Sequence, residues 1–188
     1  MGRYRARDLL LPPSLLSLAR IPLAAAFPWF AHQPSWALGV LLLAGMSDVL
    51  DGYLARRLGQ ATPTGAVVDG VLDKLFVAVV IGGLLLQGRL TWFAAGLLAT
   101  RELGELPLVA WWVTHEDRRR ARAEDPRANW LGKAATVCQF VAIASILIQG
   151  EPSYFWLVIT ALIGLVSAAG YWRRELQAAG ARAEAKSR

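Results

Sequence analysis

Six long apolar segments restrict what this chain can fold into. They cover residues 9–31, 36–54, 66–86, 92–113, 130–148 and 154–171. Each is close to the ~20 residues that a helix needs to cross a lipid bilayer. Only 18% of the residues are charged, whereas a typical soluble domain has about 25%. We therefore predict an all-α integral membrane protein with six transmembrane helices.

The positions of the basic residues predict how these helices are oriented. Of the 20 Lys and Arg residues, 15 lie in the N-terminal segment, in the second and fourth loops and in the C-terminal tail. The other three loops, 32–35, 87–90 and 150–153, contain only Arg89. Because cytoplasmic loops are enriched in Lys and Arg, we expect both termini in the cytoplasm. The same distribution explains the net charge of +6 without a nucleic-acid partner.

We expect a single membrane domain over residues 1–188. Residues 1–10 would form a juxtamembrane segment, residues 114–129 a solvated connector, and residues 173–188 a cytoplasmic tail that is a helix and frays into solvent. Arg20 interrupts the first apolar segment and so argues against a signal peptide there. The small size and the single cysteine, Cys138, favour a bacterial inner membrane, because one cysteine cannot form an internal disulfide.

Four aspartates lie within or beside the second and third predicted helices, where a charge at mid-bilayer costs about 2.5–3.5 kcal/mol. Asp48 and Asp51 are three residues apart, and Asp69 and Asp73 are four apart, so each pair shares one helix face. The loop between the two helices, residues 57–64, is short. We therefore expect all four carboxylates to meet in a polar cavity between the second and third helices, near the cytoplasmic boundary.

Four neighbouring carboxylates repel one another and need bound cations or protons. Ligand sets made only of oxygen favour hard divalent cations such as Mg²⁺, Mn²⁺ or Ca²⁺, and no His or Cys accompanies these aspartates. Divalent cations held in this way suit phosphoryl chemistry, and Arg56 offers a two-ended donor for phosphate. Clustered carboxylates inside a membrane also occur in transporters. The residues alone therefore leave both a phosphotransferase and a divalent-cation transporter open.

The segment that holds the aspartates, SDVLDGYLARRLGQATPTGAVVDGVLDK, resembles the signature of the CDP-alcohol phosphotransferase family. The family pattern is D-x2-D-G-x2-A-R-x8-G-x3-D-x3-D. All eight fixed positions match; they are Asp48, Asp51, Gly52, Ala55, Arg56, Gly65, Asp69 and Asp73. The resemblance implies an enzyme that transfers a phosphatidyl group from CDP-diacylglycerol to an alcohol and releases CMP. It also implies a homodimer in the membrane.

Roles for single residues follow from this resemblance. Asp48, Asp51, Asp69 and Asp73 would bind two divalent cations, Mg²⁺ or Mn²⁺, with Ca²⁺ as a substitute or inhibitor. Asp73 would also be the catalytic general base on the acceptor hydroxyl. The CDP site would be lined by the remaining motif residues, Gly52, Ala55, Arg56 and Gly65.

Three basic residues outside the motif are candidates for contacts with an acceptor or lipid phosphate. Arg20 ends a segment, PSLLSLAR, that is similar to the family's first helix, P-N-x-(L/I)-(T/S)-x-x-R. Arg101 and Lys133 lie in segments that resemble the fourth and fifth helices. Arg20 and Arg101 could instead balance the charge of nearby carboxylates. Lys133 could instead place its charge at the membrane interface.

The expected acceptor is glycerol 3-phosphate, which would give phosphatidylglycerol phosphate. Phosphatidylglycerol, the acceptor of a cardiolipin synthase reaction, and inositol phosphate are the alternatives. Three positions depart from the family's patterns. Ser14 replaces the usual Asn of the first helix, and Gly70 replaces the Pro of glycerophosphate-type members, where Leu72 also replaces Ala.

Overall fold

A computed structural model describes residues 8, 11–60, 62–114 and 130–187. Every regular element in this part of the chain is a helix, which confirms the all-α prediction. The contacts between helices divide the chain into two compact units. Unit 1 contains residues 1–91 and 144–151, and unit 2 contains residues 92–143 and 152–188. The predicted connector, residues 114–129, lies outside the described residues apart from Thr114, as does most of segment 1–10. The single-domain prediction stays a prediction.

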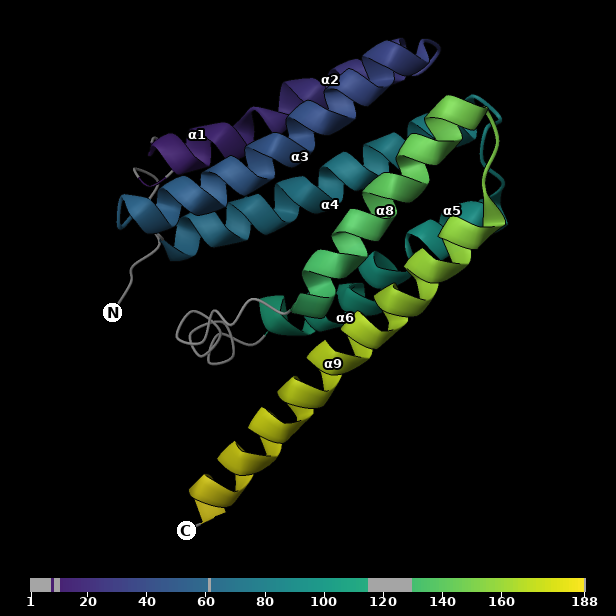
Figure 1. Cartoon of the computed structure of the whole chain (residues 1–188). Coiled ribbons are helices and arrows are strands. Elements are labelled where there is room, and N and C mark those ends of the chain that lie inside the picture. The colour runs from purple at the N-terminus through teal and green to yellow at the C-terminus, as the bar shows by residue number, and fades with distance from the viewer. Residues whose placement is uncertain (1–7, 9–10, 61, 115–129, 188) are drawn as a thin grey trace. The chain divides into compact units, whose positions relative to one another are not determined.

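Unit 1 is built from four helices that lie side by side (Figure 1). They are α1 (Pro12–Leu18), α2 (Arg20–Phe30), α3 (Pro34–Arg57) and α4 (Pro63–Leu86). Helices α1 and α2 follow one another and pack against both α3 and α4. The core between them contains fully buried Phe27, Val80 and Leu84. The Phe27 ring lies against Gly83 of α4.

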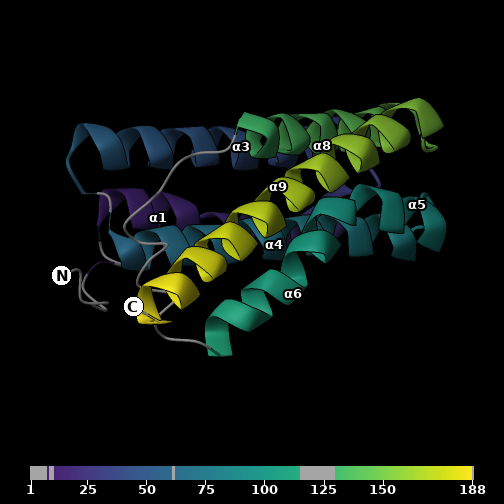
Figure 2. The same ribbon diagram turned by 90° about the horizontal axis from the view of Figure 1, so that it is seen from below.

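Unit 2 contains α5 (Trp92–Leu98), α6 (Thr100–Thr114), most of α8 (Trp130–Gln149) and α9 (Tyr154–Ser187). Helix α6 lies along α9 (Figure 2). Small residues permit this close approach, since a Cβ added to Gly104 would lie 2.7 Å from the Cβ of Ala168. The Trp172 indole also donates to the Gly104 carbonyl at 2.9 Å. Contacts through small residues are typical of helices that pack within a membrane.

Among the described residues, three helices are long and apolar enough to cross a membrane. They are α3, residues Gly132–Gln149 of α8, and residues Tyr154–Arg174 of α9. About two thirds of each apolar stretch is not buried inside the protein, and α3 leaves Leu42, Met46 and Val49 exposed. Such exposed apolar faces are typical of contact with lipid. Helix α4 has similar length but includes Asp69, Asp73 and Lys74. The six-span topology and its orientation stay predictions.

The first and fourth predicted segments each contain two helices rather than one. The first divides at Ala19. Pro22 explains this break, because proline has no N–H to donate to the Leu18 carbonyl and its ring crowds that group. The fourth divides at Ala99. There the Thr100 hydroxyl lies 3.0 Å from the Gly96 carbonyl and 2.8 Å from the Leu97 carbonyl, a contact that often bends helices.

The last helix is longer than the predicted span. Residues 173–187, which we expected to form a helical tail, do so and continue α9 without interruption as far as Ser187. Ala, Glu, Gln, Leu and Arg dominate this stretch, and all five residue types favour helices. The chain therefore extends the helix beyond the apolar part that could lie in a bilayer.

Candidate metal and substrate site

The turn between α3 and α4 places the two aspartate pairs opposite each other. Helix α3 ends in a Schellman motif. The Gln60 amide donates to the Ala55 carbonyl at 2.9 Å, and the Gly59 amide donates to the Arg56 carbonyl at 3.4 Å. Gly59 has a φ of 62°, which glycine adopts without strain. Helix α4 then begins at Pro63, where the Thr62 side chain accepts from the Gly65 amide at 3.1 Å.

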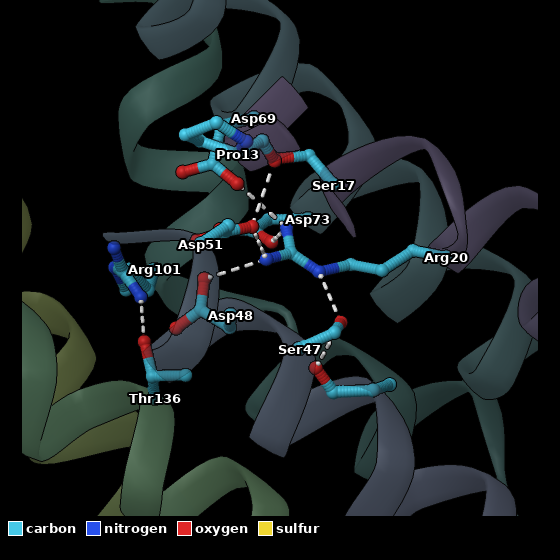
Figure 3. Close-up of polar contacts among 11 residues, drawn as sticks. Pro13, Ser17, Arg20, Ser47, Asp48, Asp51, Asp69, Asp73, Arg101 and Thr136 are labelled. Carbon is cyan, nitrogen blue, oxygen red and sulfur yellow. Dashed lines mark hydrogen bonds and ion pairs between the residues drawn. The ribbon is translucent and has the colours of Figure 1, made fainter. Parts of the chain in front are cut away.

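Arg20 lies at the centre of the four carboxylates (Figure 3). Its Nη2 donates to Asp48 Oδ1 at 3.1 Å and to Asp51 Oδ2 at 2.6 Å. Its Nη1 donates to Asp69 Oδ1 at 2.8 Å and also to Asp73 Oδ1. The structure therefore brings all four predicted aspartates together. Arg20 is 2% exposed, so its charge is compensated inside the protein, as buried charges require.

Two serines hold the cluster in place. The Ser17 hydroxyl donates to Asp51 Oδ2 at 2.8 Å, and Arg20 Nε donates to Ser47 Oγ at 3.2 Å. Sequence reasoning missed both serines. Their positions carry a signal, however, because Ser17 is three residues before Arg20 and Ser47 four before Asp51, so each shares a helix face with its neighbour.

The carboxylates fit a divalent cation. Asp48, Asp51 and Asp69 each offer one carboxylate oxygen, and these three oxygens lie within 4.8 Å of one another. Oxygen donors with negative charge are the ligands that hard cations prefer. Asp51 is 4% exposed, whereas 45% of the Asp73 side chain is exposed. Asp48 and Asp69 are also partly exposed, so the cluster is anchored on one buried residue and is open at the other three.

The residues predicted to contact CDP lie close to the aspartates on the same two helices. The Arg56 guanidinium folds back over Gly52, where an added Cβ would lie 3.4 Å from Nη1. At Gly65 an added Cβ would lie 3.1 Å from Thr62 Oγ1 and 3.3 Å from Ser14 Oγ. The structure thus places buried Ser14, the residue that departs from the family pattern, directly beside Gly65.

Arg101 and Lys133 belong to unit 2. Arg101 Nε donates to Glu105 Oε1 at 3.0 Å, and its Nη1 donates to Thr136 Oγ1 at 2.6 Å (Figure 3). Glu102 accepts from Gln139 Nε2 at 3.1 Å. Arg101 therefore has a carboxylate partner on its own helix, in keeping with the charge-balance role. Lys133 is exposed on α8. A phosphate contact of Arg101 or Lys133 stays a prediction.

Comparison with known proteins identifies the class to which this fold and site belong. A family model described as CDP-alcohol phosphatidyltransferase matches residues 10–169. The cardiolipin synthase (CMP-forming) of Streptomyces coelicolor is 33% identical over 155 residues, which are 78% of this chain and 69% of that protein. The CDP-diacylglycerol--glycerol-3-phosphate 3-phosphatidyltransferase of Pseudomonas fluorescens is also 33% identical, over 78% of this chain and 77% of that protein.

A protein of the same name from Salmonella paratyphi A is 32% identical over 142 residues, which are 72% of this chain and 75% of that protein. The chain belongs to the CDP-alcohol phosphatidyltransferase family. It is therefore a transferase of phospholipid biosynthesis, and this assignment decides between the enzyme and the transporter that the residues alone left open.

Proposed function

We propose that this protein transfers a phosphatidyl group from CDP-diacylglycerol to glycerol 3-phosphate and releases CMP. The cluster of four aspartates around Arg20 carries this proposal, because it assembles the family signature in one place. The relatives from Pseudomonas fluorescens and Salmonella paratyphi A, whose names state this donor and acceptor, support it. The product would be phosphatidylglycerol phosphate.

The aspartates Asp48, Asp51, Asp69 and Asp73 would hold two divalent cations, Mg²⁺ or Mn²⁺. When bound, these cations would neutralise charge on the two bridging phosphates of the donor and on the departing CMP. Asp73 would accept the proton of the acceptor hydroxyl as its oxygen attacks the phosphorus attached to diacylglycerol. The bond from that phosphorus to the CMP oxygen then breaks. Exposure of the Asp73 carboxylate supports this role, because a general base must reach its substrate.

The remaining motif residues would bind the nucleotide. Gly52 and Gly65 leave space near the backbone, and the Arg56 guanidinium beside Gly52 offers donors to a phosphate. Ala55 would line the same site. We keep Arg20, Arg101 and Lys133 as the residues proposed to contact the phosphate of the acceptor or of a lipid.

We also propose the arrangement of the whole enzyme. Six spans with both termini in the cytoplasm would place the aspartates near the cytoplasmic face of a bacterial inner membrane. The bias of basic residues toward alternate loops supports this orientation. The protein would act as one domain and assemble as a homodimer.

Phosphatidylglycerol is a second candidate acceptor. The relative from Streptomyces coelicolor is named a CMP-forming cardiolipin synthase, and that reaction uses phosphatidylglycerol as the alcohol. Both reactions attack the same phosphorus atom of the same donor, so the aspartate cluster serves either one. The two functions differ only in which alcohol reaches Asp73.

Release of CMP by the purified protein tests the function. The assay contains CDP-diacylglycerol, Mg²⁺ or Mn²⁺, and one acceptor at a time: glycerol 3-phosphate, phosphatidylglycerol, inositol phosphate, inositol or serine. We expect CMP with glycerol 3-phosphate. CMP with phosphatidylglycerol alone would replace the first acceptor by the second. No CMP with any acceptor would contradict the proposed function.

A further inference from the structure

Arg20 contacts the same carboxylates that would bind a divalent cation. Its two Nη atoms donate to one oxygen of each of the four aspartates. We propose that Arg20 and the divalent cation compete for this cluster, so that the guanidinium must leave the carboxylates when a cation binds. This inference rests on the metal role of the aspartates proposed above.

The geometry leaves little room for both cations at once. Asp48, Asp51 and Asp69 are the three residues whose oxygens converge within 4.8 Å, and all three already accept from Arg20 at 2.6–3.1 Å. A guanidinium and a divalent cation bound to the same three carboxylates would repel each other, because their positive charges would lie only a few ångströms apart. The repulsion is avoided if Arg20 leaves the carboxylates when the cation binds, but not if both stay bound to them.

The Arg20 guanidinium is held through its Nε atom as well as through its two Nη atoms. Its Nε donates to Ser47 Oγ at 3.2 Å, and Ser47 Oγ in turn donates to the Ala44 carbonyl at 2.9 Å. Arg20 is also the first residue of α2, directly after the break at Ala19. Because the guanidinium is planar and rigid, moving its Nη atoms away from the carboxylates also moves Nε away from Ser47, whereas helix α2 can stay in place.

Once a cation has replaced it at the carboxylates, Arg20 can bind a phosphate. A guanidinium released from carboxylates is a planar two-ended donor, which matches the oxygens of a phosphate. The pairing with aspartates in this structure and the phosphate contact predicted from the sequence then describe two positions of one side chain. Binding of the cation would deliver Arg20 to the phosphates of the substrate.

Binding of Mn²⁺ alone, without lipid donor or acceptor, tests the competition. The full-length protein in detergent is titrated with Mn²⁺, and free Mn²⁺ is followed by electron paramagnetic resonance. We expect Arg20→Gln, which removes the competing charge, to bind Mn²⁺ on the order of tenfold or more tightly than the wild type. Arg20→Lys keeps a charge but presents a single point donor, so its affinity should lie between the two.

Arg57→Gln is the matched control. It removes the same charge from an exposed residue on α3 that contacts the Tyr53 ring and hydroxyl, and we expect no change in Mn²⁺ affinity. Arg20→Gln binding Mn²⁺ as weakly as the wild type, or more weakly, would overturn the proposal. A residue that only held the carboxylates together would give that weaker binding, so the direction of the change separates the two roles.

A second measurement covers the case in which Arg20→Gln is unstable without a cation. Tighter binding to the folded protein raises its melting temperature further, so Mn²⁺ should stabilise Arg20→Gln more than the wild type. If that variant cannot be purified, Arg20→Lys decides the matter, with affinity at or below wild type overturning the proposal. Wild-type protein that neither binds Mn²⁺ nor releases CMP would instead contradict the proposed function itself.

Discussion

Among single residues, Asp73 differs from the other three aspartates in how it is held. Asp51 is buried and accepts from both Ser17 and Arg20. Asp73 lies outside the group of three aspartates whose oxygens converge, and its side chain is partly exposed, as are those of Asp48 and Asp69. A carboxylate that is near the cations but open to substrate is suited to exchange protons. This difference supports a catalytic role for Asp73 rather than for Asp51.

Replacing Asp73 with Asn should abolish CMP release and leave the protein folded. The carboxamide keeps the size of the side chain but cannot take up the proton of the hydroxyl, and loss of a general base lowers rates about 10²–10⁴-fold. Turnover is measured by CMP release, and folding by the melting temperature in detergent.

Asp8→Asn is the control for this variant. Asp8 accepts from the Thr64 hydroxyl at 3.0 Å, which an amide oxygen can still do, so we expect activity close to wild type. Turnover by Asp73→Asn at the wild-type rate would show that another group takes the proton.

Gly65 should be the least replaceable glycine of α4. A methyl group there would lie 3.1 Å from Thr62 Oγ1 and 3.3 Å from Ser14 Oγ, and overpacking costs about 1–3 kcal/mol. We expect Gly65→Ala to lower the melting temperature and raise the KM for CDP-diacylglycerol. Gly82→Ala is the control, because nothing lies within 4 Å of its added Cβ. Equal stability and equal KM in the two variants would argue against a crowded site at Gly65.

The aspartates of the site could be predicted from the sequence, but the partners of Arg20 could not. Spacings of three and four residues place each aspartate pair on one face, and a short loop joins their helices. Arg20, however, lies 28 to 53 residues from the four aspartates, and contacts over that distance depend on how helices pack. Charge balance and phosphate contact therefore both remained open for Arg20, and the structure shows the first.

At the scale of elements, the turn from α3 to α4 determines whether the four carboxylates meet. Its residues 58–62 must reverse the chain and begin a new helix within a few positions. Gly59 supplies the left-handed backbone, and Thr62 caps the helix that follows. Sequence reasoning predicted a short loop here but not its hydrogen bonds. The break at Ala99 was not predicted either. The Thr100 hydroxyl contacts two carbonyls of the preceding turn there, but an isolated threonine in a sequence gives no clear signal of a bend.

Gly59→Ala should weaken this turn. An alanine at a φ of 62° costs about 1–2 kcal/mol in the left-handed region, so the melting temperature should fall and activity should fall with the alignment of the aspartates. Gly39→Ala within α3 is the control. Nothing lies within 4 Å of its added Cβ, and alanine favours a helix interior over glycine by about 1 kcal/mol. A Gly59→Ala protein as stable as Gly39→Ala would contradict this account of the turn.

At the scale of the whole molecule, the apolar segments and the basic loops predict more than the helices alone show. All six predicted segments are helical where the structure describes them, yet in this part of the chain only three helices combine the length and apolar character of a span. The other segments are interrupted by Pro22 and Thr100 or carry the charges of the site on α4. The site charges on α4 interrupt the apolar pattern by which a span is identified, whereas α3 keeps a long enough apolar stretch before Asp48 and Asp51.

Labelling of single cysteines tests the orientation in the membrane. Cys138→Ala provides a background without cysteine, to which Ser35→Cys or Ser187→Cys is added. We expect a membrane-impermeant maleimide to label Ser35→Cys in intact cells, because residues 32–35 form an outer loop in the proposed topology. Ser187→Cys should react only after the membrane is opened. Labelling of Ser187→Cys in intact cells would contradict cytoplasmic termini.

Phosphatidyl transfer at the aspartate cluster is measured most directly by the balance of its two products. Purified protein is incubated with CDP-diacylglycerol, glycerol 3-phosphate and Mg²⁺, and both CMP and phosphatidylglycerol phosphate are quantified with and without a chelator. We expect equal amounts of the two products, formed only when the acceptor and the divalent cation are both present. CMP formed without the acceptor or in the presence of the chelator would contradict this account, as would the absence of CMP from protein that binds the donor.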